Sequence, residues 1–160
     1  MIGGASRVAT VATALGAATT GGVFFAFSTF VMQGLRAIEP RKGLVAMQAI
    51  NVAAPTPAFM TALLGTAVLS GGLVVVGTRN LDEPWAGYLV VGGLLYLVSI
   101  GVTIGYHVPR NDRLALVDPE GADAVRAWTT YASAWTRWNH VRTVSSLAAA
   151  AVLVLGLRAE

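Results

Sequence analysis

Long stretches without a charged residue are the feature that most constrains this chain. Residues 8–35, 43–78 and 84–109 contain no Asp, Glu, Lys or Arg, so these stretches run for 28, 36 and 26 residues. A helix that crosses a bilayer needs about 20 mostly apolar residues. A fourth stretch, 143–157, has only 15, but it can be extended backward through Trp128. The pattern predicts an all-α fold, a four-helix transmembrane bundle.

The composition indicates that lipid is the solvent of the chain. Hydrophobic residues make up 55% and charged residues only 12% of the sequence, whereas soluble domains carry roughly 25% charged residues. The absence of cysteine excludes disulfides and thiolate metal sites. The net charge of +3 is scattered, without the basic stripe and interleaved aromatic residues of a nucleic-acid interface. We therefore expect the lipid bilayer, and no nucleic acid, as a partner.

One integral membrane domain is expected over residues 1–160, with spans at approximately 8–34, 55–77, 85–107 and 122–157. Pro55 and Pro57 suit the first turn of the second span, where a proline removes no helical hydrogen bond. Pro109 ends the third span. The turn signal "DPEG" at 118–121 places the start of the fourth helix ahead of the membrane, as a pre-membrane extension.

Basic residues predict the orientation of the bundle. The segments between spans one and two and between spans three and four are rich in basic residues: Arg36, Arg41, Lys42, Arg110, Arg113 and Arg126. The opposite side has Arg7, Arg79 and Arg158. The positive-inside rule puts loops 35–54 and 108–125 in the cytoplasm and both termini outside. A homodimer is compatible with so small a bundle, although nothing in the sequence specifies one.

Polar residues gather at the same end of the predicted bundle. The end of span one, the approach to span two, the end of span three and the start of span four all carry them, whereas the other end holds only a short turn. We expect the following residues to share one leaflet or its headgroup layer: Ser28, Gln33, Gln48, Asn51, His107, Asn111, Asn139, His140 and Arg142.

Helical geometry divides the polar residues of the fourth span. At 100° per residue, one stripe about 80° wide is expected to face the bundle. Its members are Trp128, Tyr131, Trp135, Asn139, Arg142 and Ser146. His140 lies about 100° or more from the stripe. An arginine in the apolar zone costs several kcal/mol unless it is paired, hydrated or snorkelling. Arg142 therefore either stabilises an anionic ligand or snorkels to the headgroups.

Histidine and asparagine side chains offer further chemistry. His107 and His140 are the only histidines, and an imidazole can act as a base or bind a metal. They have no acidic or cysteine partner nearby in sequence, so a metal site is weakly supported, and a metal or haem cofactor stays open with these two as candidate ligands. Asn51, Asn111 and Asn139 either donate to a carbonyl or oxyanion or satisfy helix ends.

Four segments in order resemble the anthrone oxygenase-like family of small four-helix membrane proteins, which has bacterial members. They are "GGVFFAFSTFVMQGL" (21–35), "AMQAINVAAPTPAFM" (46–60), "HVPRNDRLA" (107–115) and "WTRWNHVRTVSSLAAAAVL" (135–153). The resemblance runs from about residue 20 to 155. The family's recurring polar positions match Asn51, Asn111, Trp135, Asn139, His140 and Arg142. The family usually has asparagine where this chain has His107 and leucine where it has Arg110.

The resemblance implies a membrane-embedded oxygenase, because characterised fungal relatives oxidise anthrones to anthraquinones. The expected substrate is a lipophilic phenol-, anthrone- or quinol-like aromatic, in a bacterial inner or plasma membrane. Asn139 and Arg142 are then expected to stabilise an enolate and His140, or His107, to take the proton, before dioxygen attacks the carbanion. The expected substrate-binding residues are Ser28, Gln48, Asn51, Asn111 and Trp135.

Two other functions compete with the oxygenase. The chain can be a non-catalytic membrane module, either a complex subunit or a lipophile-binding protein, because family membership alone does not fix chemistry. A small transporter is disfavoured, since no span has an acidic residue in its middle and neither broken helices nor an inverted repeat is visible.

Overall fold

The structure, a computed structural model, describes residues 3–159 and is all-α. The first and last residues of the expected domain, 1–2 and 160, lie outside the described residues. In chain order the helices are α1 (Gly4–Ala26), α2 (Met32–Ala37), α3 (Pro40–Ala53), α4 (Pro57–Met60), α5 (Thr66–Thr78), α6 (Ala86–Val102), α7 (Val108–Ala115) and α8 (Ala124–Gly156). Single π-helical turns, η1 (Phe27–Val31), η2 (Thr61–Gly65) and η3 (Thr103–His107), join α1 to α2, α4 to α5 and α6 to α7.

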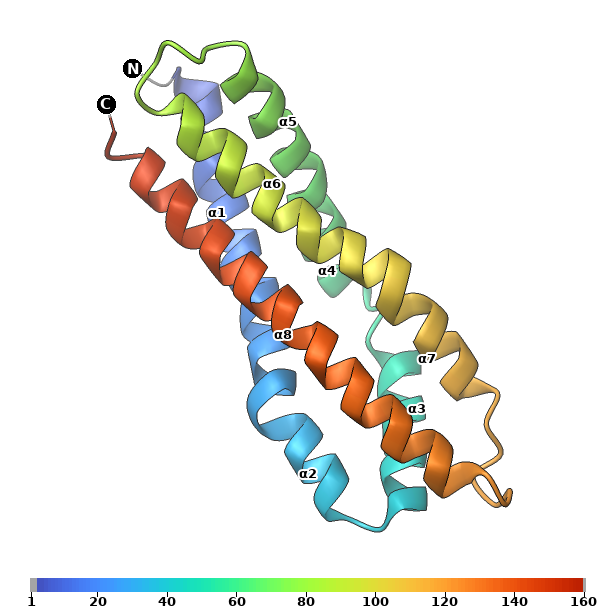
Figure 1. Ribbon diagram of the computed structural model, residues 1–160. Helices are drawn as coiled ribbons and strands as arrows, with labels where there is room; N and C mark the ends of the chain where they lie inside the picture. The colour runs from blue at the N-terminus through green and yellow to red at the C-terminus, as the bar shows by residue number, and fades with distance from the viewer. Residues whose placement is uncertain (1–2, 160) are drawn as a thin grey trace.

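The predicted four-helix transmembrane bundle is confirmed. Three continuous helical segments, Gly4–Ala37, Pro57–Thr78 and Ala86–Ala115, are long and apolar enough to cross a bilayer, which indicates an integral membrane protein. The fourth member is α8, which packs against α1 and α6 along its length (Figure 1). At 1.5 Å per residue its 33 residues extend about 50 Å, well beyond the roughly 30 Å hydrocarbon core.

Both described ends of the chain lie at one end of the bundle, together with the turn between α5 and α6 (Figure 1). The opposite end holds α2, α3, α7 and the first half of α8. This is the end at which the sequence places the polar segments. The structure therefore gathers them at one end, as predicted.

The segment between the first two spans is a helix, although the sequence analysis treats residues 35–54 as a loop. Pro40 begins α3 at a position where no helical hydrogen bond is lost. Leu44 and Met47, one turn apart, are fully buried in a cluster with Trp128 of α8. The chain then turns at residues 54–56, where the Phe59 amide donates to the Thr56 hydroxyl at 3.2 Å and caps α4.

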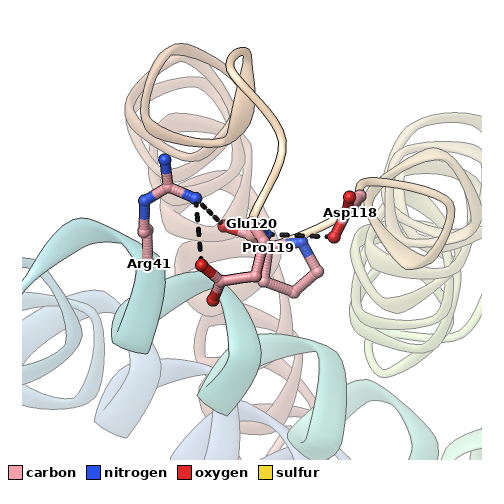
Figure 2. Close-up of polar contacts among 4 residues, drawn as sticks. All are labelled: Arg41, Asp118, Pro119 and Glu120. Atoms are coloured by element: carbon pink, nitrogen blue, oxygen red, sulfur yellow. Dashed lines mark hydrogen bonds and ion pairs between the residues drawn. The ribbon is translucent and has the colours of Figure 1, made fainter.

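Two polar side chains of α3, Arg41 and Gln48, fix this helix against the end of α7 and the segment that joins α7 to α8. Figure 2 shows Arg41 at the start of α3 donating to the Pro119 carbonyl and pairing with the Glu120 carboxylate at 3.8 Å. The Glu120 amide in turn donates to Asp118 Oδ1 at 3.0 Å. Two turns further along α3, Gln48 Nε2 donates to the carbonyls of Leu114 and Val117, both at 2.9 Å. These contacts hold α3 across the polar end of the bundle.

Close backbone approach holds the apolar end together. A Cβ added at Gly93 of α6 would lie 2.7 Å from the Ser70 carbonyl oxygen of α5 and 2.7 Å from Val74 Cγ2. Such contacts are typical of membrane helices, which gain no hydrophobic driving force from packing and depend on van der Waals contact. Gly101, two turns further along α6, has nothing within 4 Å of the same position.

We expect Gly93→Ala to lower the free energy of unfolding by about 1–3 kcal/mol, because the backbone of α5 must move. Gly101→Ala is the matched control and should be neutral or slightly stabilising, since alanine favours helix. Thermal unfolding in detergent, followed by circular dichroism, measures both. Equal melting temperatures for the two variants would contradict the close contact between α5 and α6.

Candidate functional site

A cavity of about 250 Å³ lies at the polar end of the bundle, between α1, α3, α4, α7, α8 and the three π-helical turns. Its wall is mostly apolar and includes four aromatic rings, those of Phe24, Phe27, Phe59 and Trp135. The polar residues on the wall are Asn51, Thr103, His107, Asn111 and Arg142. The volume is slightly below the usual range for ligand pockets, which run from about 300 to 1,000 Å³, so the cavity suits one small molecule.

All three π-helical turns contribute to the wall of the cavity. Phe27 comes from η1, Leu63 from η2, and Thr103 and His107 from η3. A π-helical turn is a local widening of a helix that leaves a backbone carbonyl without its usual partner, and such turns are frequent at functional sites. Three separate spans are therefore irregular at the level of the cavity.

Arg142 places a buried guanidinium on the cavity wall. Its side chain is almost inaccessible, at 6% exposure, and its Cζ lies 4.1 Å from the centre of the Phe24 ring. Nη2 donates to Asn139 Oδ1 at 2.6 Å and Nη1 to the Thr103 hydroxyl at 3.4 Å. Within residues 3–159, Nε has no hydrogen-bond partner and no carboxylate forms an ion pair with the group.

Asn139 holds Arg142 in place and has no donor left for a ligand. Its Nδ2 donates to the Phe24 carbonyl at 2.7 Å and to the Ser28 hydroxyl at 2.8 Å, so both amide hydrogens are engaged. Its Oδ1 accepts from Arg142. The Phe24 carbonyl lies just ahead of η1, so Asn139 satisfies backbone at the widened turn. We therefore assign Asn139 a positioning role rather than direct contact with an oxyanion.

A second polar chain lines the other side of the cavity. The Tyr131 hydroxyl donates to Asn111 Oδ1 at 2.8 Å, and Trp135 Nε1 donates to the same oxygen at 3.1 Å. Asn51 Nδ2 is 3.5 Å from the Tyr131 hydroxyl, at the limit of a hydrogen bond. Because the Asn111 oxygen accepts twice, its Nδ2 is the group that can donate to a ligand.

His107 is the titratable group that the cavity encloses most fully, at 1% exposure. Its ring meets Trp135 edge-on, with 4.8 Å between centroids and 78° between planes. In the described part of the chain, neither ring nitrogen has a partner at hydrogen-bonding geometry.

The structure separates the two histidines. His140 is exposed and lies near Leu95 of α6 and near Val141 and Val144 of α8, on the outer surface of the bundle and away from the buried stripe. The six stripe residues are all buried. His140 is therefore not brought together with Arg142 and His107, and it is a poor candidate for the base.

Two of the expected substrate-binding residues do not line the cavity. Gln48 is engaged with backbone carbonyls at the end of α7 and in the segment after it. Ser28 lies behind the wall, where its hydroxyl contacts Asn139 and is 3.0 Å from the Thr143 hydroxyl. Asn51, Asn111 and Trp135 do line the cavity.

Sequence reasoning missed Thr103, whose hydroxyl contacts Arg142. A signal was present, because Thr103, His107 and Asn111 follow one another at four-residue spacing and therefore share a helix face. All three line the cavity.

The described residues include no group of three or more His, Cys, Asp or Glu side chains that could hold a metal ion. Among strong metal ligands of these types, the cavity wall offers His107 alone. The donor set on the wall therefore does not fit a metal centre.

If Asn139 supports the backbone at η1, its loss should destabilise the fold. We expect Asn139→Leu to lower the free energy of unfolding by at least about 1 kcal/mol, because the Phe24 carbonyl, Ser28 and Arg142 all lose a buried partner. His140→Ala, the adjacent exposed position, is the control and should leave it nearly unchanged. The measurement is the thermal midpoint in detergent. A midpoint for Asn139→Leu equal to that of His140→Ala would rule out the positioning role.

Comparison with models of protein families gives a match over residues 44–152 with the family described as anthrone oxygenase. The matched region covers more than half of the chain and includes α3 to α8 up to Val152, and with them most of the cavity wall. No curated protein and no solved structure matches the sequence.

Proposed function

Since the chain belongs to the anthrone oxygenase family, we propose that it oxidises a lipophilic, anthrone-like aromatic inside the membrane. The substrate class is a planar ring system whose carbonyl makes an adjacent or conjugated C–H acidic. Dioxygen is the oxidant. The cavity at the polar end of the bundle is the proposed active site, in the leaflet that the positive-inside rule assigns to the cytoplasmic side.

The observation that carries the proposal is the unpaired guanidinium on an aromatic wall. A buried arginine is costly unless it is compensated, and within residues 3–159 no carboxylate compensates Arg142. Its Nε–H, without a partner in this part of the chain, can donate to an oxygen that becomes negative. Such a donor is worth most where charge develops during the reaction, in a site that excludes water.

His107 is the proposed proton acceptor. It lies on the same wall as Arg142, and its unengaged ring nitrogens leave a neutral imidazole able to accept a proton. This assigns to His107 the role that the sequence analysis gave first to His140. The family usually has asparagine at this position, so the base is proposed as a property of this chain.

The proposed reaction conserves atoms and electrons at each step. His107 takes one proton from the CH₂ of the substrate, and the carbonyl oxygen becomes an enolate that Arg142 stabilises. The carbanion carbon donates two electrons to dioxygen, forms a C–O bond and, with a proton, gives a hydroperoxide. Loss of the second C–H proton then breaks the O–O bond and releases hydroxide, which leaves as water. The sum is CH₂ plus O₂ giving C=O plus H₂O.

The remaining wall residues suit a flat, lipophilic substrate. Phe24, Phe27 and Trp135 offer ring faces and edges, and aromatic pairs of this kind contribute about 0.5–1.5 kcal/mol each. Asn111 Nδ2 can donate to a second substrate oxygen. The rim includes the exposed Val23 and the exposed corner at Ala54 and Pro55, so the proposed route of access is from the lipid.

Oxygen uptake by the purified protein with anthrone as substrate tests the proposal. We expect Arg142→Gln to lower kcat by about 10²–10³-fold, the usual effect of removing one donor to an oxyanion, and His107→Gln to lower it by about 10²-fold or more. Arg137→Gln and His140→Gln are controls at exposed positions of the same helix and should retain activity.

The outcomes separate catalysis from the alternative of a non-catalytic module. Wild-type protein that binds anthrone without consuming oxygen would identify a lipophile-binding protein. Full activity in both Arg142→Gln and His107→Gln would contradict the assigned roles and leave the family activity itself standing.

A bulky side chain that fills the cavity should prevent the substrate from binding, whereas the same side chain outside the cavity should not. Ile50 of α3 lines the cavity, whereas Val52, two residues on, is 83% exposed. We expect Ile50→Trp to weaken anthrone binding by tenfold or more, on the order of the effect of losing one well-packed contact, and Val52→Trp to leave it unchanged. Fluorescence titration under nitrogen measures both, and equal affinities would place the substrate outside this cavity.

A further inference from the structure

A second and larger hollow, a groove of about 460 Å³, lies outside the bundle core, between α7 and the first turns of α8. It is distinct from the active-site cavity, and the two share no lining residue. Three arginines, Arg110, Arg113 and Arg126, line it together with one carboxylate, that of Asp123.

Two of the three arginines are not neutralised. Arg126 pairs with Asp123 at 2.8 Å. Within residues 3–159, no carboxylate forms an ion pair with Arg110 or Arg113. An anion in this groove therefore meets two free guanidinium groups, whose planar forks match the oxygens of a phosphate.

Stacking against aromatic rings holds one of these two arginines, Arg110, in place. The Arg110 Cζ lies 3.9 Å from the centre of the Tyr106 ring, and the Tyr106 ring lies 4.8 Å from that of Trp138. The three side chains form a stack that joins η3, α7 and α8. The stack holds the guanidinium beside the groove.

The surroundings of the groove belong to the headgroup layer. Arg110 and Arg113 lie near the end of the third candidate span, Ala86–Ala115. Trp138 is 41% exposed, and Leu116, next to the groove lining, is 86% exposed. Tryptophan and tyrosine favour the membrane–water interface, and an exposed leucine there can enter the acyl boundary. A lipid headgroup fits this setting better than a soluble anion.

We propose that the groove between α7 and α8 binds the phosphate of an anionic phospholipid, with Arg110 and Arg113 as its ligands. Nothing in this inference depends on the chemistry in the cavity. Its consequence is positional: a bound headgroup fixes the depth of α7 in the membrane, and with it the level of Asn111 and His107 in the adjacent cavity.

Native mass spectrometry in a neutral detergent tests the site, with phosphatidylglycerol and phosphatidylcholine as probes. We expect wild-type protein to bind phosphatidylglycerol in preference to phosphatidylcholine. Arg110→Gln/Arg113→Gln should weaken phosphatidylglycerol binding by roughly thirtyfold, since each arginine near an anionic lipid surface contributes about fivefold. Arg79→Gln/Arg158→Gln removes the same charge from exposed positions at the other end and should change binding by less than about twofold.

Each remaining outcome overturns the inference. Equal weakening by both double variants would mean that net charge and not this groove attracts the lipid. Displacement of phosphatidylglycerol by millimolar inorganic phosphate would identify a soluble anion as the occupant. No preference for phosphatidylglycerol in wild-type protein would remove the site altogether. Unchanged circular dichroism and thermal midpoint establish that the variants are folded.

Discussion

The burial of the Arg142 guanidinium in an apolar bundle is the constraint on which the rest of the polar end depends. A cation at this depth must find compensation within the protein or in a ligand. The protein supplies part of it, through Asn139, Thr103 and the face of the Phe24 ring. A cation–π contact contributes only about 0.5–2 kcal/mol, and no carboxylate of residues 3–159 completes the compensation. The arrangement favours an anion in the cavity, and an enolate is the anion that the proposed reaction would form there.

The same residues that hold Arg142 also explain the irregular backbone. Asn139 donates its amide hydrogens to the Phe24 carbonyl and the Ser28 hydroxyl. A side chain of α8 therefore serves as a donor to a backbone acceptor beside the widened turn η1. Non-helical backbone at membrane depth is tolerated where it is buried in protein or lines a cavity. The three π-helical turns meet this condition, and they bring Phe27, Leu63 and His107 to one wall.

Much of this organisation can be predicted from the sequence, and its limits have physical causes. The uncharged stretches predict the bundle, and 100° periodicity predicts the buried stripe of α8 and separates His140 from it. Helix α3 is not predicted as a separate helix, because its apolar residues belong to the same uncharged stretch as the next span. The π-helical turn η1 is not predicted, because the contact made there by Asn139 comes from a residue that lies 115 positions from Phe24 in the sequence. His107 departs from the family pattern, and only the fold reveals that it lines the cavity.

The most direct measurement of the central claim is an absorption spectrum of anthrone bound to the protein in the absence of oxygen. If Arg142 stabilises the enolate, binding at neutral pH should produce the long-wavelength band of the anthrone anion, with one equivalent per chain. Arg142→Met should bind the ligand without that band. A spectrum of neutral anthrone in the wild-type complex, at saturation, would contradict the account.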